Sequence, residues 1–150
     1  MSKELKNTQE INSKSILLPY FICLIIGCLL LQTFISFNDH EISLASNILL
    51  ALVALSSAPF LIANKTKLNK IRFGYLVLSL GTFVIVNGSY HLHAYYLAVI
   101  KSPALVSGAD YLPINNGWFG LIFGMPGFWA LGLIVHIIAS VVLRGFEERR

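Results

Sequence analysis

Histidines and a dense polar–aromatic segment are the residues of this chain best suited to chemistry. Segment 87–96 reads Asn-Gly-Ser-Tyr-His-Leu-His-Ala-Tyr-Tyr and places His91 and His93 two residues apart. Imidazole is a common metal ligand and proton carrier. Residues two apart on a helix point about 200° away from each other, so the pair cannot chelate one ion by itself. A metal site here would need ligands from other segments.

The other two histidines lie in different settings. His40 belongs to a short acidic loop, Asn-Asp-His-Glu at 38–41, and Ser43 can cap the helix that follows this loop. His136 lies inside the last apolar stretch. The apolar stretches contain no carboxylate, and the chain has no glycine-rich phosphate loop and no zinc-type Cys/His spacing. The residues therefore favour a protein that is not an enzyme.

The elements that would position these residues are four long apolar stretches. The chain is 56% hydrophobic and 12% charged, whereas soluble domains carry about 25% charged residues. Each stretch can cross a hydrocarbon core of about 30 Å as a helix. We therefore predict a single all-α membrane domain over 1–150, a four-helix bundle with tails at 1–15 and 144–150. The predicted spans are 16–37, 44–63, 71–100 and 117–143.

Charge predicts the orientation of these spans. Segment 64–72 holds four basic residues and no acid, so the positive-inside rule places it inside. The acidic loop 38–41 and the connection 101–116 are then outside, and both termini are inside. The net charge of +4 is explained by these flanks, so the bilayer is the expected partner and nucleic acid is not. The plasma membrane or an inner membrane is the expected location.

This topology assigns each histidine a depth. With Arg72 at the inner boundary, His91 and His93 lie roughly 28 and 31 Å above it, and His136 lies roughly 12 Å above that boundary. His40 shares the outer level, so His40, His91 and His93 are the candidate ligands of a divalent metal, the only cofactor suggested. We expect His40 and His91 to carry the site, with His136 too deep to contribute. For the cluster 90–96 the favoured interpretation is an interfacial belt with structural hydrogen bonds, where Tyr and His are ordinary residues; a metal or ligand site and a subunit contact are the alternatives.

Several residues in the spans are predicted to serve helix packing. Asn87 should bond to another helix, to Ser46 or Asn47, because an unpaired amide is costly in lipid. His136 should be neutral and bonded to a hydroxyl or carbonyl group. Two glycines form a small-xxx-small face that allows close helix approach, and two prolines should bend their helices. The packing set is Asn87, Gly120, Gly124, Pro126 and His136, and Pro59 should bend the second span.

These features favour a small accessory, assembly or scaffold subunit of a membrane complex. Its partner would be another membrane protein or further copies of the same chain. One alternative is an outward-facing site for metal binding, small-ligand binding or redox chemistry at the outer rim of the bundle. Another alternative is a small transporter that works as a dimer.

Overall fold

The computed structural model describes residues 13–71, 73–106 and 114–145, and the regular structure in these ranges is helical. The only sheet-like feature in them is an isolated bridge between Val106 and Ile114. The helices are α1 (Ser13–Phe37), α2 (Leu44–Leu55), α3 (Ser57–Lys70), α4 (Gly74–Val99), α5 (Asn116–Phe119), the π-helical segment η1 (Gly120–Gly124) and α6 (Met125–Gly145).

Four helical stretches are long and apolar enough to cross a membrane, which confirms the all-α, multi-span prediction. They cover Ser15–Phe37, Leu44–Lys70, Gly74–Val99 and Asn116–Val142. The first, third and fourth agree closely with the predicted ranges. The second extends past residue 63, so the basic residues at 65, 67 and 70 lie on the end of a helix instead of in a loop.

The second span is broken at Ser56, as the proline in its sequence predicts. Pro59 has no N–H to bond the carbonyl of Leu55, and its ring crowds that carbonyl. The chain makes a turn at Ser56 between α2 and α3. Ser56 Oγ donates to the Val53 carbonyl at 2.6 Å, and the next serine bonds a carbonyl in the same way. Both hydroxyls thereby satisfy their own donor groups on the backbone of the second span, where lipid offers no other partner.

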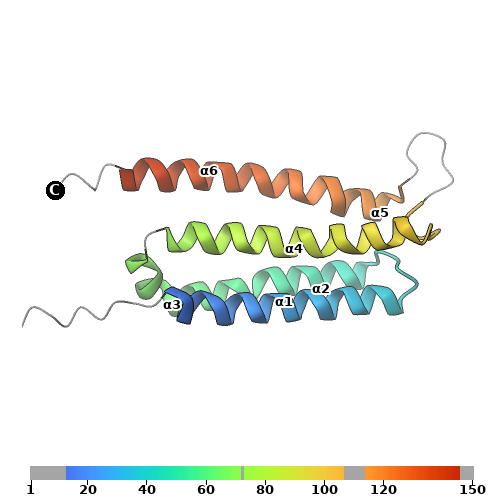
Figure 1. Ribbon diagram of the computed structural model, residues 1–150, viewed down its shortest axis with the longest axis horizontal. Coiled ribbons are helices and arrows are strands. Elements are labelled where there is room, and N and C mark those ends of the chain that lie inside the picture. The colour runs from blue at the N-terminus through green and yellow to red at the C-terminus, as the bar shows by residue number, and fades with distance from the viewer. Residues whose placement is uncertain (1–12, 72, 107–113, 146–150) are drawn as a thin grey trace, which may run out of the picture.

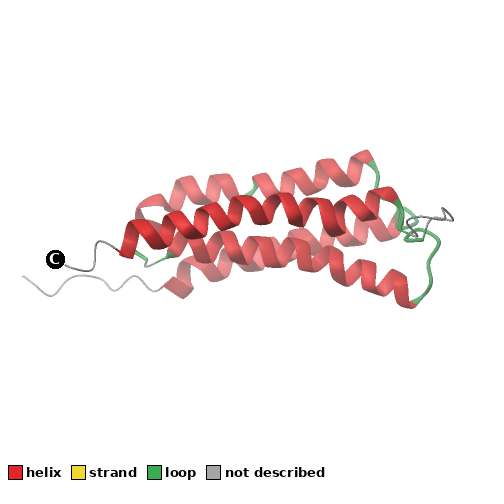
Figure 2. Cartoon of the chain, turned by 90° about the horizontal axis from the view of Figure 1, so that it is seen from above, coloured by secondary structure: helices red, strands yellow, loops and turns green. Residues whose placement is uncertain are grey.

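The helices form an open arrangement in which α4 is central (Figure 1). α1 packs along one side of α4, α6 packs against another, and α2 lies on α1. The α1–α2 loop and the α4–α5 connection lie together at one end of the bundle, and the α3–α4 connection lies at the opposite end (Figure 2). We call the first of these, formed by residues 38–43, 100–106 and 114–116, the loop end.

The α1–α4 interface contains most of the core. Buried residues recur at helical spacing on both helices, and Ile35, Val86 and Leu97 are almost fully inaccessible. A buried polar pair, Tyr20 and Thr82, lies within this interface. Thr82 Oγ1 donates to the Leu78 carbonyl at 2.7 Å, so Tyr20 donates its hydroxyl proton to Thr82 Oγ1 at 2.8 Å. Both hydroxyls are thereby satisfied inside the bundle.

Gly81 on α4 lies against the ring of Phe21 on α1. A Cβ there would lie 2.5 Å from the ring of Phe21, whereas a Cβ at Gly132 on α6 would meet nothing within 4 Å. We expect Gly81→Leu to reduce the free energy of unfolding by about 1–3 kcal/mol, the usual cost of overpacking. Thermal unfolding in detergent measures this cost, with Gly132→Leu as the control. Equal melting temperatures for the two variants would contradict the close approach.

Candidate functional site

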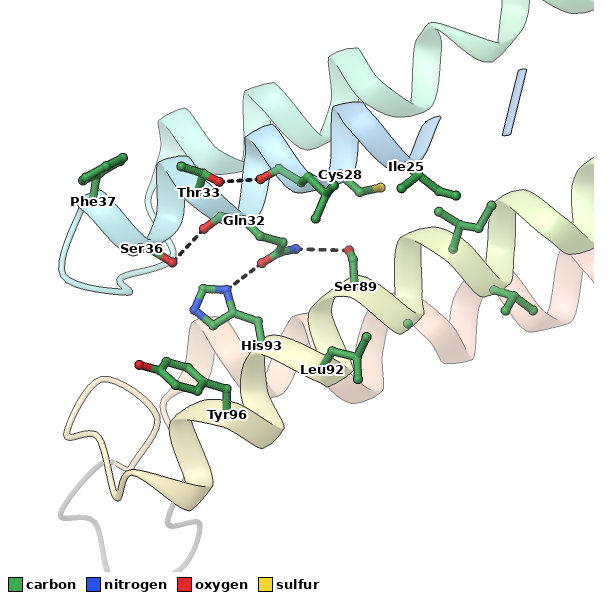
Figure 3. Close-up of a pocket in the computed structure, with 14 residues that line it drawn as sticks. Ile25, Cys28, Gln32, Thr33, Ser36, Phe37, Ser89, Leu92, His93 and Tyr96 are labelled. Carbon is green, nitrogen blue, oxygen red and sulfur yellow. Dashed lines mark hydrogen bonds between the residues drawn. The ribbon is translucent and has the colours of Figure 1, made fainter. Parts of the chain in front are cut away.

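A chain of side-chain hydrogen bonds lies between α1 and α4 at the loop end (Figure 3). Nδ1 of His40 lies 2.9 Å from Nε2 of His93, and Nδ1 of His93 lies 2.7 Å from Oε1 of Gln32. Gln32 Nε2 is 3.1 Å from Ser89 Oγ, which is 2.8 Å from the Val86 carbonyl. We call this series the His40–Ser89 chain. It joins the α1–α2 loop, α1 and α4.

The chemistry of its members fixes the direction of the His40–Ser89 chain. The Val86 carbonyl can only accept, so Ser89 donates to it, and Ser89 Oγ then accepts from the amide of Gln32. Gln32 Oε1 therefore accepts from Nδ1–H of His93. A neutral His93 then has a bare Nε2, which accepts from Nδ1–H of His40. The network thus leaves His40 with Nε2 unprotonated, as a lone pair, when both rings are neutral.

The backbone of His40 is held in an unfavourable conformation. Asp39 and His40 have φ angles of 53° and 60°, in the left-handed region that costs a non-glycine residue about 1–2 kcal/mol. The N–H of His40 donates to the Ile35 carbonyl at 3.0 Å, and its own carbonyl accepts from Nε1 of Trp118 at 3.0 Å. With the ring bonded to His93, three separate elements fix this residue. Such over-determined strain is typical of functional positions.

The buried Trp118 packs against the site and bonds it. It opens the last span, is 0% exposed, and its ring centroid lies 5.1 Å from that of His93 and 6.3 Å from that of Tyr90. Its indole N–H is the donor that fixes the His40 carbonyl. The buried indole therefore fixes the position of His93 and of the α1–α2 loop together.

A groove of about 760 Å³ runs between α1 and α4 beside the His40–Ser89 chain. Apolar side chains line most of it, and polar groups gather toward the loop end, as Figure 3 shows. Tyr96 closes this polar end, with its ring centroid 6.3 Å from that of His40. The lining residues used below are Ile25, Leu29, Thr33, Ser36, Val84, Gly88, Leu92 and Tyr96.

The structure brings together two of the three histidines predicted as metal ligands. His93 is 8% exposed and contacts His40. His91 is exposed, and its Nδ1 lies 2.8 Å from the Asn87 carbonyl of its own helix. His40 therefore pairs with His93 and not with His91, because positions two apart on α4 face opposite ways. Within the described ranges, no group of three or more His, Cys, Asp or Glu residues is placed to hold a metal.

Two buried polar residues differ from expectation. Asn87 Nδ2 donates to the Phe83 carbonyl of its own helix at 2.8 Å, instead of to Ser46 or Asn47 on α2. The reason is that α2 packs mainly on α1 and not on α4. Oδ1 of Asn87 and Nε2 of His136 are buried and have no hydrogen-bond partner among the described residues. The hydroxyl or carbonyl partner expected for His136 is therefore not at its Nε2.

The glycines of the last span lie at the predicted irregularity but not at a helix contact within the chain. A Cβ at Gly120 or Gly124 would meet nothing within 4 Å among the described residues, because the buried side chains of this span are those of Trp118, Leu121 and Leu133. The two glycines are the first and last residues of the π-helical segment η1, which ends two residues before Pro126. Pro126 lacks the N–H that a regular α-helix requires, which accounts for the departure at this place.

Gln32 is a member of the site that was not among the residues predicted from the sequence. Gln32 is the only side-chain amide of the first span, and a lone amide in an apolar helix must find a partner. That requirement was the available signal. Nothing comparable in the sequence pointed to Trp118 as the donor to His40.

The chemistry offered by this arrangement is that of an oriented base. A proton taken up at His40 Nε2 can be relayed to His93, but the Gln32 amide does not release a proton, so the chain ends there. The His40–Ser89 chain is therefore suited to accepting a hydrogen bond and not to moving protons across the bundle. Comparisons with protein-family models, with curated proteins and with solved structures found no match.

Proposed function

We propose that the protein is a non-enzymatic membrane protein that binds a small ligand at its outer rim through His40. The observation that carries this proposal is the direction of the His40–Ser89 chain, which leaves the Nε2 lone pair of His40 as an acceptor. The other ring nitrogen of a metal-ligating histidine commonly donates a hydrogen bond that fixes its tautomer and orientation, and the bond from His40 Nδ1–H to His93 does the same here.

The same geometry favours a hydrogen-bond donor over a divalent metal as the ligand. Of the two paired imidazoles, only that of His40 has a nitrogen without a hydrogen-bond partner among the described residues, because both nitrogens of His93 are bonded. A protein site for a divalent ion normally supplies three or four ligands. One imidazole lone pair can satisfy a single N–H or O–H group without any further ligand.

The test of the proposed function is the protonation pattern of the histidines. We expect ¹⁵N spectra of histidine-labelled protein in nanodiscs at pH 7 to show protonated Nδ1 and bare Nε2 for both His40 and His93. Nanodiscs made from native membrane lipid extract should shift His40 Nε2, and His91→Ala should leave that shift unchanged. A protonated Nε2 on His40 at this pH would contradict the proposal.

The proposal places the loop end outside the plasma membrane or an inner membrane, with both termini inside. It rests on the basic residues of α3, at the opposite end of the bundle from His40. In a Cys23→Ser, Cys28→Ser background, a membrane-impermeant thiol reagent added outside should label Asp39→Cys and not Lys67→Cys. The reverse pattern would place His40 on the inner side.

An accessory subunit of a membrane complex is the second candidate. It is favoured by open positions on η1 and α6, where a Cβ at Gly120, Gly124 or Gly132 would meet nothing within 4 Å in the part of the chain that the structure describes, so another helix can approach closely. Gly124→Leu should then remove a stoichiometric partner from the protein purified in mild detergent, whereas Gly88→Leu on α4 should retain it. The dimeric transporter is tested by flux into proteoliposomes.

A further inference from the structure

We propose that the ligand is an amphiphile with a primary-ammonium headgroup, with its acyl chain in the α1–α4 groove and its headgroup at His40. This inference rests on the proposed function, because it identifies the chemical class of the molecule that His40 binds. Three sets of observations carry it: the shape of the groove, the hydrogen-bonding capacity of its polar end, and the charge of the loop end.

The groove is shaped for a chain that enters from the bilayer. Its volume of about 760 Å³ lies within the roughly 300–1,000 Å³ typical of small-molecule sites. Leu29 on α1 and Leu92 on α4 line it and are 61% and 72% exposed, so its open side faces the surroundings of the spans. Ile25 and Val84 extend the apolar lining away from the loop end. An acyl chain matches this surface.

The polar end of the groove offers acceptors. Thr33 Oγ1 donates its proton to the Leu29 carbonyl at 2.8 Å, and Ser36 Oγ donates its proton to the Gln32 carbonyl at 2.9 Å. Each hydroxyl thus has only lone pairs left for a ligand. His40 does not line the groove itself, but its ring lies next to those of His93 and Tyr96, which do, so its Nε2 is a third acceptor at this end. Tyr96 adds a hydroxyl that can donate or accept. A headgroup rich in N–H or O–H donors is therefore complementary to this end.

The charge of the loop end favours a hydrogen-bond donor that is also a cation. Asp39 and Glu41 flank His40, and both are exposed. Lys101 is the single basic residue of the loop-end segments. Two carboxylates against one lysine favour a cationic group over an anionic one. A primary ammonium supplies both the positive charge and three N–H donors, whereas a trimethylated ammonium supplies the charge alone.

This difference gives a matched pair of probes. Lysophosphatidylethanolamine and lysophosphatidylcholine with the same acyl chain share charge and tail but differ in N–H donors. Native mass spectrometry of the full-length protein in a neutral detergent measures the two dissociation constants. We expect the ethanolamine lipid to bind about tenfold more tightly, the usual effect of a hydrogen bond to a charged donor. Glycerophosphoethanolamine, which has the headgroup without the chain, should not bind measurably.

Variants separate the headgroup from the groove. His40→Ala should remove the preference for the ethanolamine lipid, so that both lipids bind with the affinity of the choline lipid. His91→Ala is the control. Gly88 lines the groove, and a Cβ there would meet nothing within 4 Å among the described residues. Gly88→Leu should therefore fill the groove and lower the affinity for both lipids about tenfold or more. Gly132→Leu on α6 is its control. Leu29→Trp, at an exposed position of the groove, repeats the test should Gly88→Leu fail to fold.

Each outcome has one meaning. Equal affinity of the wild type for the two lipids would overturn the ammonium assignment, while the ¹⁵N test of His40 would still stand by itself. A preference that persists in His40→Ala would overturn the proposed function together with this inference. Unchanged affinity in both Gly88→Leu and Leu29→Trp, or tight binding of the chain-free headgroup, would overturn the groove as the site of the acyl chain.

Discussion

Trp118→Ala is expected to reduce the free energy of unfolding by about 3–5 kcal/mol, the range for truncating a buried aromatic side chain. Trp118 is 0% exposed, and its ring packs against His93 and Tyr90. The substitution also removes the donor to the His40 carbonyl. Because that carbonyl belongs to a residue held at positive φ, the α1–α2 loop should lose one of the contacts that stabilise its conformation.

Thermal unfolding in detergent and the ¹⁵N spectrum of His40 measure these two effects separately. Trp118→Phe retains an aromatic ring but no N–H, so we expect it to lose about 1 kcal/mol and to perturb the His40 signals. Trp129→Ala is the matched control, because Trp129 is only partly buried and packs on Phe83. A smaller loss for Trp118→Ala than for Trp129→Ala would contradict the role assigned to Trp118.

His93→Ala is expected to have the second largest effect, a loss of about 2 kcal/mol. It leaves Gln32 Oε1 and His40 Nδ1 without their partner, and an unsatisfied buried group costs about 1–3 kcal/mol. Two part-buried groups lose their partner here, and side-chain hydrogen bonds within membranes contribute only about 0.6–2 kcal/mol each, so the expected total stays near the middle of that range. Affinity for the ligand should fall as well, because nothing then fixes the tautomer of His40.

His91→Ala provides the control on the same helix. His91 is exposed and bonds only the carbonyl one turn before it, so its loss should cost less than about 0.5 kcal/mol. His93→Gln should recover part of the stability, since a glutamine oxygen can accept from His40 Nδ1. A single ¹⁵N tautomer of His40 that persists in His93→Ala would show that the hydrogen-bond chain does not orient this ring.

The sequence by itself determined the features that depend on local composition and spacing. Four apolar stretches predicted four membrane-length helices, because length and hydropathy alone decide whether a helix can cross a bilayer. Ser43 caps α2, with its Oγ accepting from the Ser46 N–H at 3.2 Å. Irregularities accompany Pro59 and Pro126, because a missing N–H acts on its own helix whatever surrounds it.

Only the tertiary structure decided which residues meet. Depth along the spans placed His40 level with both His91 and His93, but the rotation of α4 about its axis selects His93, and depth carries no information about rotation. The packing of α2 on α1 left Asn87 to bond its own helix, and the rotation of the last span left Gly120 and Gly124 open. The left-handed backbone of His40 is set by Ile35, Trp118 and His93, which lie on three elements. These features depend on how helices distant in sequence are rotated and packed, and helical period and hydropathy do not specify that.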